Sequence, residues 1–149
     1  MPVFDRFVPT RAARPPYAYV LDSRDTALVN LLWRHGIRAM SAAGRNPGAA
    51  DEFVVDSLVR SARPFQGHNE VRIVGRWRRA DSSSLEQGWP RADLVLVQVA
   101  GTYLAPLAMY LLDPESDDSF ATWNLLDGYL RVGRPYPVRR ILDKPLMIR

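Results

Sequence analysis

"EFVVDSLVRSARPFQGHNEVRIVGRWRRA" (residues 52–80) decides the fold class, because two segments rich in valine, isoleucine and aromatic residues are joined there by a short connection. Such residues favour β-strands. The connection, "ARPFQGH" (62–68), contains proline and glycine, which favour a turn. Because the connection is too short for a crossover helix, we expect the two strands to pair antiparallel.

The segments on either side extend this sheet. "DLVLVQV" (93–99) is a third strand candidate, and we expect it to pair with the second strand through the polar loop 81–92. Upstream, "YAYVLD" (17–22) and "IRAMSA" (37–42) have strand character, and the segment between them has helical spacing. The sequence therefore predicts a strand–helix–strand unit ahead of the antiparallel strands.

The helix expected over residues 23–36 has suitable residues at both ends. Ser23 or Asp25 can cap its amino terminus, and Gly36 lies where a left-handed carboxy-terminal cap belongs. His35 falls in the last turn, where an imidazole can bond the terminal carbonyl groups. We therefore interpret His35 as structural.

Two further helices are expected in the carboxy-terminal part. One begins near Ala105 and ends before Pro114, and the other covers "SFATWNLLDGYLRVG" (119–133). Helical spacing gives the second helix an apolar face, on which Trp123 is expected to anchor the core. The members of that face are Phe120, Trp123, Leu126 and Leu130. "RPYPVRRIL" (134–142) is expected to be an edge strand or a tail.

Together these segments predict an α+β fold. We expect a largely antiparallel or mixed sheet of about four to five strands, with a strand–helix–strand start and two carboxy-terminal helices packed on the sheet. Residues 1–16 contain four prolines and are interpreted as a leading segment, either a linker or an entry strand. Residues 17–149 are expected to form a single globular domain.

The composition limits the class of protein. The chain of 149 residues is 47% hydrophobic, which is typical of a folded domain. No apolar run approaches the roughly 20 residues needed to span a bilayer, so no membrane partner is expected. No signal-like segment marks the chain for secretion, and we slightly favour a cytoplasmic location. The absence of cysteine excludes disulfides, thiolate zinc sites and cysteine nucleophiles.

An acidic stretch, "LLDPESDDSFATWNLLD" (111–127), could hold a calcium ion or start a helix. Asp113, Glu115 and Asp117 alternate as calcium ligands do, but the glycine and the distal glutamate of a calcium loop are missing. We therefore interpret the stretch as a turn, after which Asp118 or Ser119 caps the next helix.

No set of residues in the sequence matches a catalytic or metal site. A zinc hydrolase needs three protein ligands and a carboxylate base, and the chain has only two histidines, His35 and His68. His68 lies in the connection of the hairpin and is expected either to anchor that loop or, with Gln66, to contact a partner. Neither a Gly-x-Ser-x-Gly elbow nor a phosphate-binding loop occurs. We expect no catalytic residue, no metal and no cofactor in this chain.

Arginines dominate the basic residues, since Lys144 is the only lysine among 20 lysines and arginines. Arg72, Arg76 and Arg78 share one face of a strand, while Trp77 shares the other face with the apolar residues. The arginines are candidate contacts for an acidic ligand or for nucleic acid. We interpret them in the first place as a solvated sheet face.

Several segments, read in order, resemble the carboxy-terminal accessory region of bacterial zinc carboxypeptidase-like proteins. They are "FDRFVPTRAARPPYAYVL" (4–21), "LLWRHGI" (31–37), "PFQGH" (64–68), "YLLDPESDDSFATWNLLDGYL" (110–130) and "YPVRRI" (136–141). The resemblance implies a non-catalytic domain that packs on, or extends, an upstream peptidase domain of the same polypeptide. The zinc and the catalytic glutamate of such a protein belong to that upstream domain.

One segment departs from the expected family pattern. "LVLVQVAG" (94–101) stands where an aspartate- or proline-bearing segment is expected. A second function therefore stays open, namely a free-standing binding module for an acidic ligand or nucleic acid, with nucleic acid the less favoured of the two. The sequence leaves the oligomeric state open.

Overall fold

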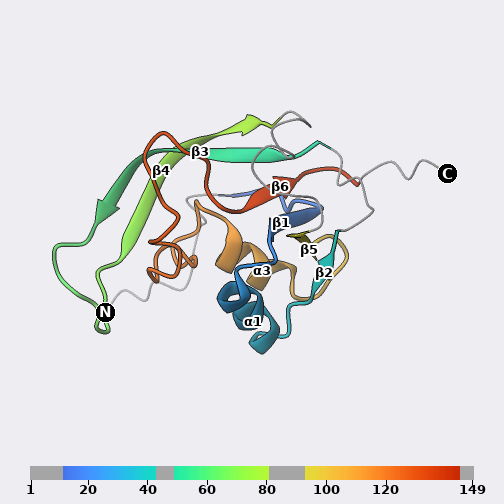
Figure 1. The fold of residues 1–149 in the computed structure, drawn as a ribbon, viewed down its shortest axis with the longest axis horizontal. Coiled ribbons are helices and arrows are strands. Elements are labelled where there is room, and N and C mark those ends of the chain that lie inside the picture. Colours follow the sequence, from blue (N-terminus) through green and yellow to red (C-terminus); the bar gives the residue numbers. More distant parts are fainter. Residues whose placement is uncertain (1–11, 43–48, 81–92, 145–149) are drawn as a thin grey trace, which may run out of the picture.

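The computed structural model describes residues 12–42, 49–80 and 93–144 (Figure 1). The described part has an α+β fold, with a six-stranded antiparallel sheet and two helices. The elements in chain order are β1 (Ala18–Asp22), α1 (Thr26–Arg34), β2 (Ala39–Ser41), β3 (Asp51–Arg60), β4 (Val71–Arg79), β5 (Leu94–Gln98), α3 (Ala105–Leu112) and β6 (Arg139–Ile141). Across the sheet the strands lie in the order β2-β5-β1-β6-β3-β4.

The hairpin of β3 and β4 confirms the antiparallel pairing expected for residues 52–80. Its turn is formed by Gln66 and Gly67, with φ values of +49° and +85°. The backbone groups of Phe65 and His68 bond to each other across this turn, at 2.8 and 3.0 Å. Two positive φ values between bonded residues are typical of a type I′ turn, whose twist matches that of the strands.

The strand–helix–strand unit is also present, but its two strands are not neighbours. β5 lies between β1 and β2 and pairs antiparallel with both. The expected pairing of the segments 69–80 and 93–99 is therefore wrong, because β4 forms the far edge of the sheet. β5 is buried on both faces, which favours a position inside the sheet. The connecting loop 81–92 lies outside the described residues.

The ends of α1 follow the sequence expectation. Asp25 accepts a hydrogen bond from the backbone N–H of Leu28 at 3.2 Å and so caps the helix. Gly36 has φ +75° and ends it. His35 is the C-cap residue, but its backbone N–H makes the bonds to the terminal carbonyls, at 3.1 and 3.2 Å, while its side chain is exposed.

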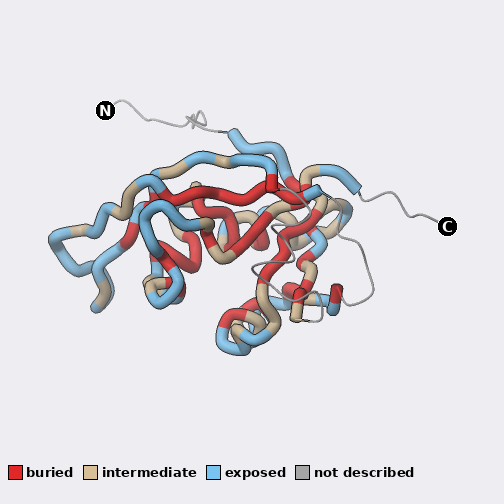
Figure 2. The backbone as a smooth tube through the Cα atoms, turned by 45° about the horizontal axis from the view of Figure 1, so that its top comes forward, coloured by how far each residue is buried: buried red, intermediate tan, exposed pale blue. Residues whose placement is uncertain are grey.

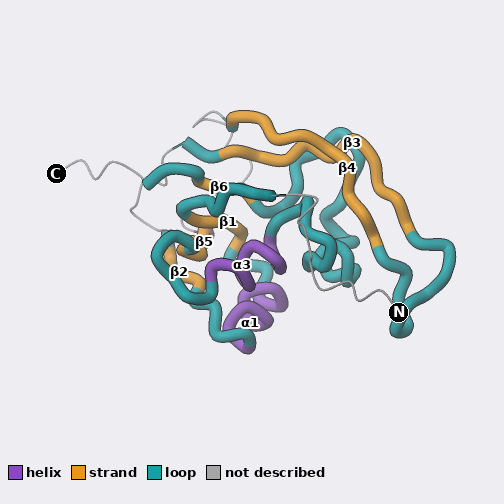
Figure 3. The backbone as a smooth tube through the Cα atoms, turned by 180° about the vertical axis from the view of Figure 1, so that it is seen from behind, coloured by secondary structure: helices purple, strands orange, loops and turns teal. Residues whose placement is uncertain are grey.

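Both helices pack on one face of the sheet, as Figures 1 and 3 show. Their buried residues Leu28, Leu32, Ala108 and Leu112 join the main core, which includes side chains of β1, β3, β4 and β5. A smaller cluster around Ala18, Val20, Leu94 and Ile141 lies on the opposite face. The central strands are therefore buried on both sides, which appears in Figure 2 as a buried band through the molecule.

The second carboxy-terminal helix that we expected over residues 119–133 is not formed. Instead, a single turn begins at Ser119, whose Oγ accepts from the N–H of Thr122 at 3.4 Å. Asn124, with φ +64°, ends it, and the N–H of Leu125 bonds the carbonyl of Phe120 at 3.0 Å. This is the bond pattern of a Schellman cap, which stops helix propagation. Further turns follow up to residue 129.

Because the helix is absent, Trp123 is not the expected core anchor. Phe120, Leu126 and Leu130 are buried as predicted, but Trp123 is 38% exposed. Its indole N–H donates to a carboxylate oxygen of Asp118. The positive φ of Asn124 redirects the chain directly after Trp123, so Leu126 and Leu130 do not share a continuous helical face with Trp123.

We expect Trp123→Ala to cost about 1 to 2 kcal/mol of unfolding free energy, since a half-exposed ring loses mainly a ring contact and a surface hydrogen bond. Leu126→Ala, at a fully buried position, is the control and should cost about 2 to 5 kcal/mol. Chemical denaturation of both variants measures the difference. Equal losses of unfolding free energy would show that Trp123 is buried in the core as Leu126 is.

The two ends of the described chain also differ from the expectation. β6 was expected to be an edge strand or a tail, but it lies inside the sheet between β1 and β3. Of the expected leading segment, residues 1–11 lie outside the described residues. Residues 12–15 are exposed, and Pro16 is already buried beside β1.

Candidate functional site

A groove lies between β4 and the turn at residues 113–117. One cavity of about 560 Å³ is lined by the strand from Glu70 to Gly75, by Phe53 and by Pro114–Asp117. A second cavity of about 710 Å³ continues past Trp77 to Arg140 and the segment 12–15. Both cavities share the side chains of the acidic turn. We call the two cavities together the β4 groove.

A bridge between Trp77 and Glu115 joins β4 to the acidic turn. The indole N–H of Trp77 donates to Glu115 Oε2 at 3.0 Å. The guanidinium of Arg140 stacks on the same indole, 3.6 Å from the ring centroid, and Phe53 contacts it edge-on at 5.2 Å. The ring is therefore held by a hydrogen bond, a cation–π contact and an aromatic contact.

The acidic turn is held in place from inside the core. Tyr19 Oη donates to Asp113 Oδ2 at 2.9 Å, and Asp113 Oδ1 accepts from the backbone N–H of Glu115 at 3.0 Å. Both Tyr19 and Asp113 are buried. The phenol thus fixes the carboxylate, and the carboxylate fixes the backbone that presents Glu115 to Trp77.

The two buried phenols near Asp113 keep their protons at neutral pH, and that of Tyr19 donates to Asp113. Burial raises the pKa of Tyr19 far above its usual range, and the negative charge of Asp113 and the hydrogen bond to it raise the pKa further. The pKa of Tyr136 is raised as well, first by burial and then by the charge of Asp113. Neither phenol is suited to accept a proton at neutral pH, so the cluster serves to position the turn.

β4 offers an unpaired backbone edge to the groove. The N–H of Val71 points away from β3 and donates to the carbonyl of Thr122 at 3.4 Å, whereas the N–H of Ala80 donates to Ala50 in the opposite direction at 2.9 Å. Because backbone direction alternates along a strand, the groups of Ile73, Gly75 and Trp77 point away from β3. Within the described ranges, no backbone group pairs with them.

The predicted arginine face is exposed, as expected, but most of it is ion-paired. Arg76 pairs with Asp56, and Arg78 Nε donates to Glu52 Oε1 at 2.6 Å. Both acids come from β3, the strand next to β4. Arg72 has no acidic partner in the described part of the chain. On the outer face of the sheet, the arginines of β4 therefore lie beside the acids of β3.

One member of the next strand shares these acids. Arg139, on β6, lies with its Nη2 3.4 Å from Glu52 Oε2 and is buried. Burial lowers the pKa of its guanidinium, and the charge of Glu52 opposes that shift.

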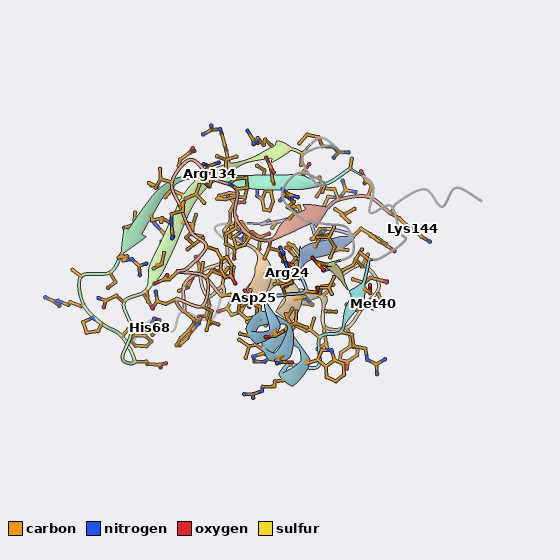
Figure 4. The ribbon with its side chains drawn as sticks, viewed as in Figure 1. Arg24, Asp25, Met40, His68, Arg134 and Lys144 are labelled. Carbon is orange, nitrogen blue, oxygen red and sulfur yellow. The ribbon has the colours of Figure 1, made fainter. Side chains whose placement is uncertain are left out.

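His68 and Gln66 are the candidate contacts from the hairpin connection. His68 lies at the tip of the hairpin (Figure 4), and Gln66 lies in the turn between Phe65 and His68. The His68 ring stacks on Trp123 with 4.5 Å between centroids, and its Nδ1 lies 3.2 Å from Asn124 Oδ1. Asn124 Nδ2 in turn donates to the carbonyl of Asn69 at 3.0 Å. These contacts fasten the hairpin tip to the turns after α3, which is the loop-anchoring alternative for His68. Gln66 is exposed in the turn itself.

The structural candidates are distributed around the same turns. Asp118 does not cap a helix but accepts from Trp123, whereas Ser119 caps a single turn. His35 lies at the end of α1 and is not part of the groove. The structure therefore brings together His68 and Trp123, with Asp118 beside them, and leaves His35 apart.

Sequence reasoning missed the residues that build the groove, namely Tyr19, Asp113 and Arg140, and the bond between Glu115 and Trp77. Their contacts join positions far apart in the chain, up to 94 residues for Tyr19 and Asp113. One local signal was present. Gly75 interrupts a β-rich segment, and an isolated glycine in a strand often marks a close approach to its backbone.

Within the ranges 12–42, 49–80 and 93–144, no group of three or more acidic or histidine side chains is placed to hold a metal ion. Neither described helix has the length and apolar character required to cross a bilayer. No family model, curated protein or solved structure matches this chain.

Proposed function

We propose that this chain is a non-catalytic interaction domain that binds an extended segment of a partner protein along the edge of β4. The observation that carries the proposal is the open edge itself, where Ile73 and Gly75 line the first cavity of the β4 groove and Trp77 lines the second. An exposed strand edge is a template for a further strand, because main-chain hydrogen bonds supply affinity and flanking pockets supply specificity.

The polar groups of the groove support binding over catalysis. Tyr19 is held protonated and Asp113 is engaged by two donors, so both are occupied in shaping the turn. The bond from Trp77 to Glu115 is already made in the free protein, so it fixes the position of the turn relative to β4. A preformed groove lowers the ordering cost of association.

The sequence resemblance supports the choice of partner. In bacterial zinc carboxypeptidase-like proteins, such a region accompanies an upstream peptidase domain in the same polypeptide, and that domain carries the zinc. The partner that we propose is therefore a peptidase domain of this kind, which this chain packs on or extends. The nucleic-acid alternative is less well supported, because Arg76 and Arg78 are already engaged by acids of β3.

Amide hydrogen exchange tests the proposal. In the free protein, we expect fast exchange at Ile73, Gly75 and Trp77 and slow exchange at the alternate positions, whose N–H groups bond β3. Adding the catalytic domain of a bacterial zinc carboxypeptidase-like protein should slow the three fast amides. Protection confined to another surface, or no protection at all, would contradict the proposed function.

A further inference from the structure

We infer that the occupant of the β4 edge is an extended segment with acidic side chains at alternate positions and apolar side chains between them. This inference rests on the proposed function and adds the chemistry of the segment. A strand added to β4 presents its side chains alternately to the two faces of the sheet. Each face of β4 therefore favours a different kind of side chain on the added strand.

The outer face selects acids. There, Arg72, Arg76 and Arg78 are exposed together with Val74. Arg76 and Arg78 are already paired with acids of β3, so they contribute less to the choice of partner than Arg72 does. Residues directly opposite one another on neighbouring strands lie within about 5.5 Å at Cβ, so opposite charges stabilise and like charges destabilise the pairing. Arg72 has the strongest preference for an acidic side chain on the partner, because no acid in the described part of the chain pairs with it.

The inner face selects apolar side chains. The wall of the 560 Å³ cavity next to the edge includes Phe53, Ile73 and Pro114. Phe53 and Ile73 are buried in this wall, and Gly75 adds no side chain over them, so an apolar side chain opposite Gly75 would extend the apolar wall. Glu115 and Asp117 line the same cavity, so a carboxylate on this face would meet like charge.

The charge pattern also separates this occupant from a second copy of the chain. Two β4 edges paired antiparallel about Gly75 would set Arg72 of one copy near Arg78 of the other. Cationic edge residues of this kind oppose self-association. An acidic strand removes the repulsion.

The test uses the full chain and three synthetic eight-residue peptides. The first peptide alternates glutamate with valine, and the second alternates lysine with valine. The third peptide has the composition of the first, but its glutamates are placed next to one another in one block. We expect the first to bind at least about tenfold more tightly than the others by calorimetry, to weaken with added salt, and to slow exchange at Ile73, Gly75 and Trp77.

A charge reversal on the edge provides the matched comparison. Arg72→Glu should lower affinity for the glutamate peptide by about fivefold and raise affinity for the lysine peptide. Arg134→Glu, an exposed arginine on the far side of β3, is the control and should change neither. Thermal unfolding of both variants verifies that the fold is retained.

The outcomes distinguish this inference from the proposed function. If the peptidase domain protects the β4 edge but the peptides show no charge preference, the inference fails and the proposed function stands. If the glutamate peptide protects the edge and the peptidase domain does not, the choice of partner fails. Sedimentation equilibrium tests for self-association. If the protein forms a dimer and the edge amides are protected at high protein concentration, the occupant of the edge is a second copy of the chain and not an acidic segment.

Discussion

Gly75→Ala is expected to lower the free energy of unfolding by about 3 kcal/mol, although it adds only one methyl group. A Cβ at this position would lie 2.5 Å from Cε1 of Phe53, and it would also meet the backbone carbonyl of Val54. Neither neighbour is the end of a flexible side chain, so relief requires a shift of the strand. Urea denaturation of wild type and variant measures the loss.

Gly128→Ala is the matched control for this prediction. Gly128 is exposed, and a Cβ there would have no neighbour within 4 Å. We expect its stability to stay within about 0.5 kcal/mol of wild type. If Gly75→Ala were equally well tolerated, the ring of Phe53 would not lie against Gly75, and the apolar floor of the β4 groove would be absent.

Alkaline pH should destabilise the protein steeply. The pKa values of Tyr19 and Tyr136 are raised in the folded state by burial, from an ordinary value of 10.0. Above that value the unfolded chain releases both protons and the native protein keeps them, so unfolding is favoured as pH rises. The stability that the neutral phenols confer is complete below pH 10 and falls above it, by about 1.4 kcal/mol per pH unit for each tyrosine.

Two variants attribute this slope to the buried phenols. Tyr136→Phe removes one buried phenol and should reduce the decline of unfolding free energy between pH 10 and 11 by about half. Tyr103→Phe, at a position that is 91% exposed, should leave the decline unchanged. Denaturant unfolding over this pH range measures both. Identical slopes in wild type and Tyr136→Phe would show that Tyr136 ionises freely in the native state.

The sequence did not predict the β4 groove, but it did predict the directions of the side chains along β4. The inward side of Trp77 and the outward side of Arg72 followed from alternation along a strand, which depends only on the pleat. The partners of Trp77 did not follow, because Glu115 and Arg140 approach it through the tertiary fold. The acidic stretch was correctly interpreted as a turn, but its attachment to the core through Tyr19 was not foreseen.

What the sequence by itself determined were the features set by neighbouring residues. These include the hairpin with its turn at Gln66 and Gly67, the cap of α1 by Asp25, and the end of that helix at Gly36. Each depends on local backbone preference or on a hydrogen bond between residues close in the chain. The α+β class followed from the same local patterns.

Only the tertiary structure decided the order of the strands and the fate of the last predicted helix. β5 lies between β1 and β2 because it buries both faces there, a gain that involves strands distant in sequence. The helical turn that begins at Ser119 ends at Asn124, and the side chain of Asn124 bonds His68 and Asn69 at the hairpin tip. Long-range burial and hydrogen bonding outweighed the helical spacing, because such spacing stabilises a helix only where that helix packs as one continuous face.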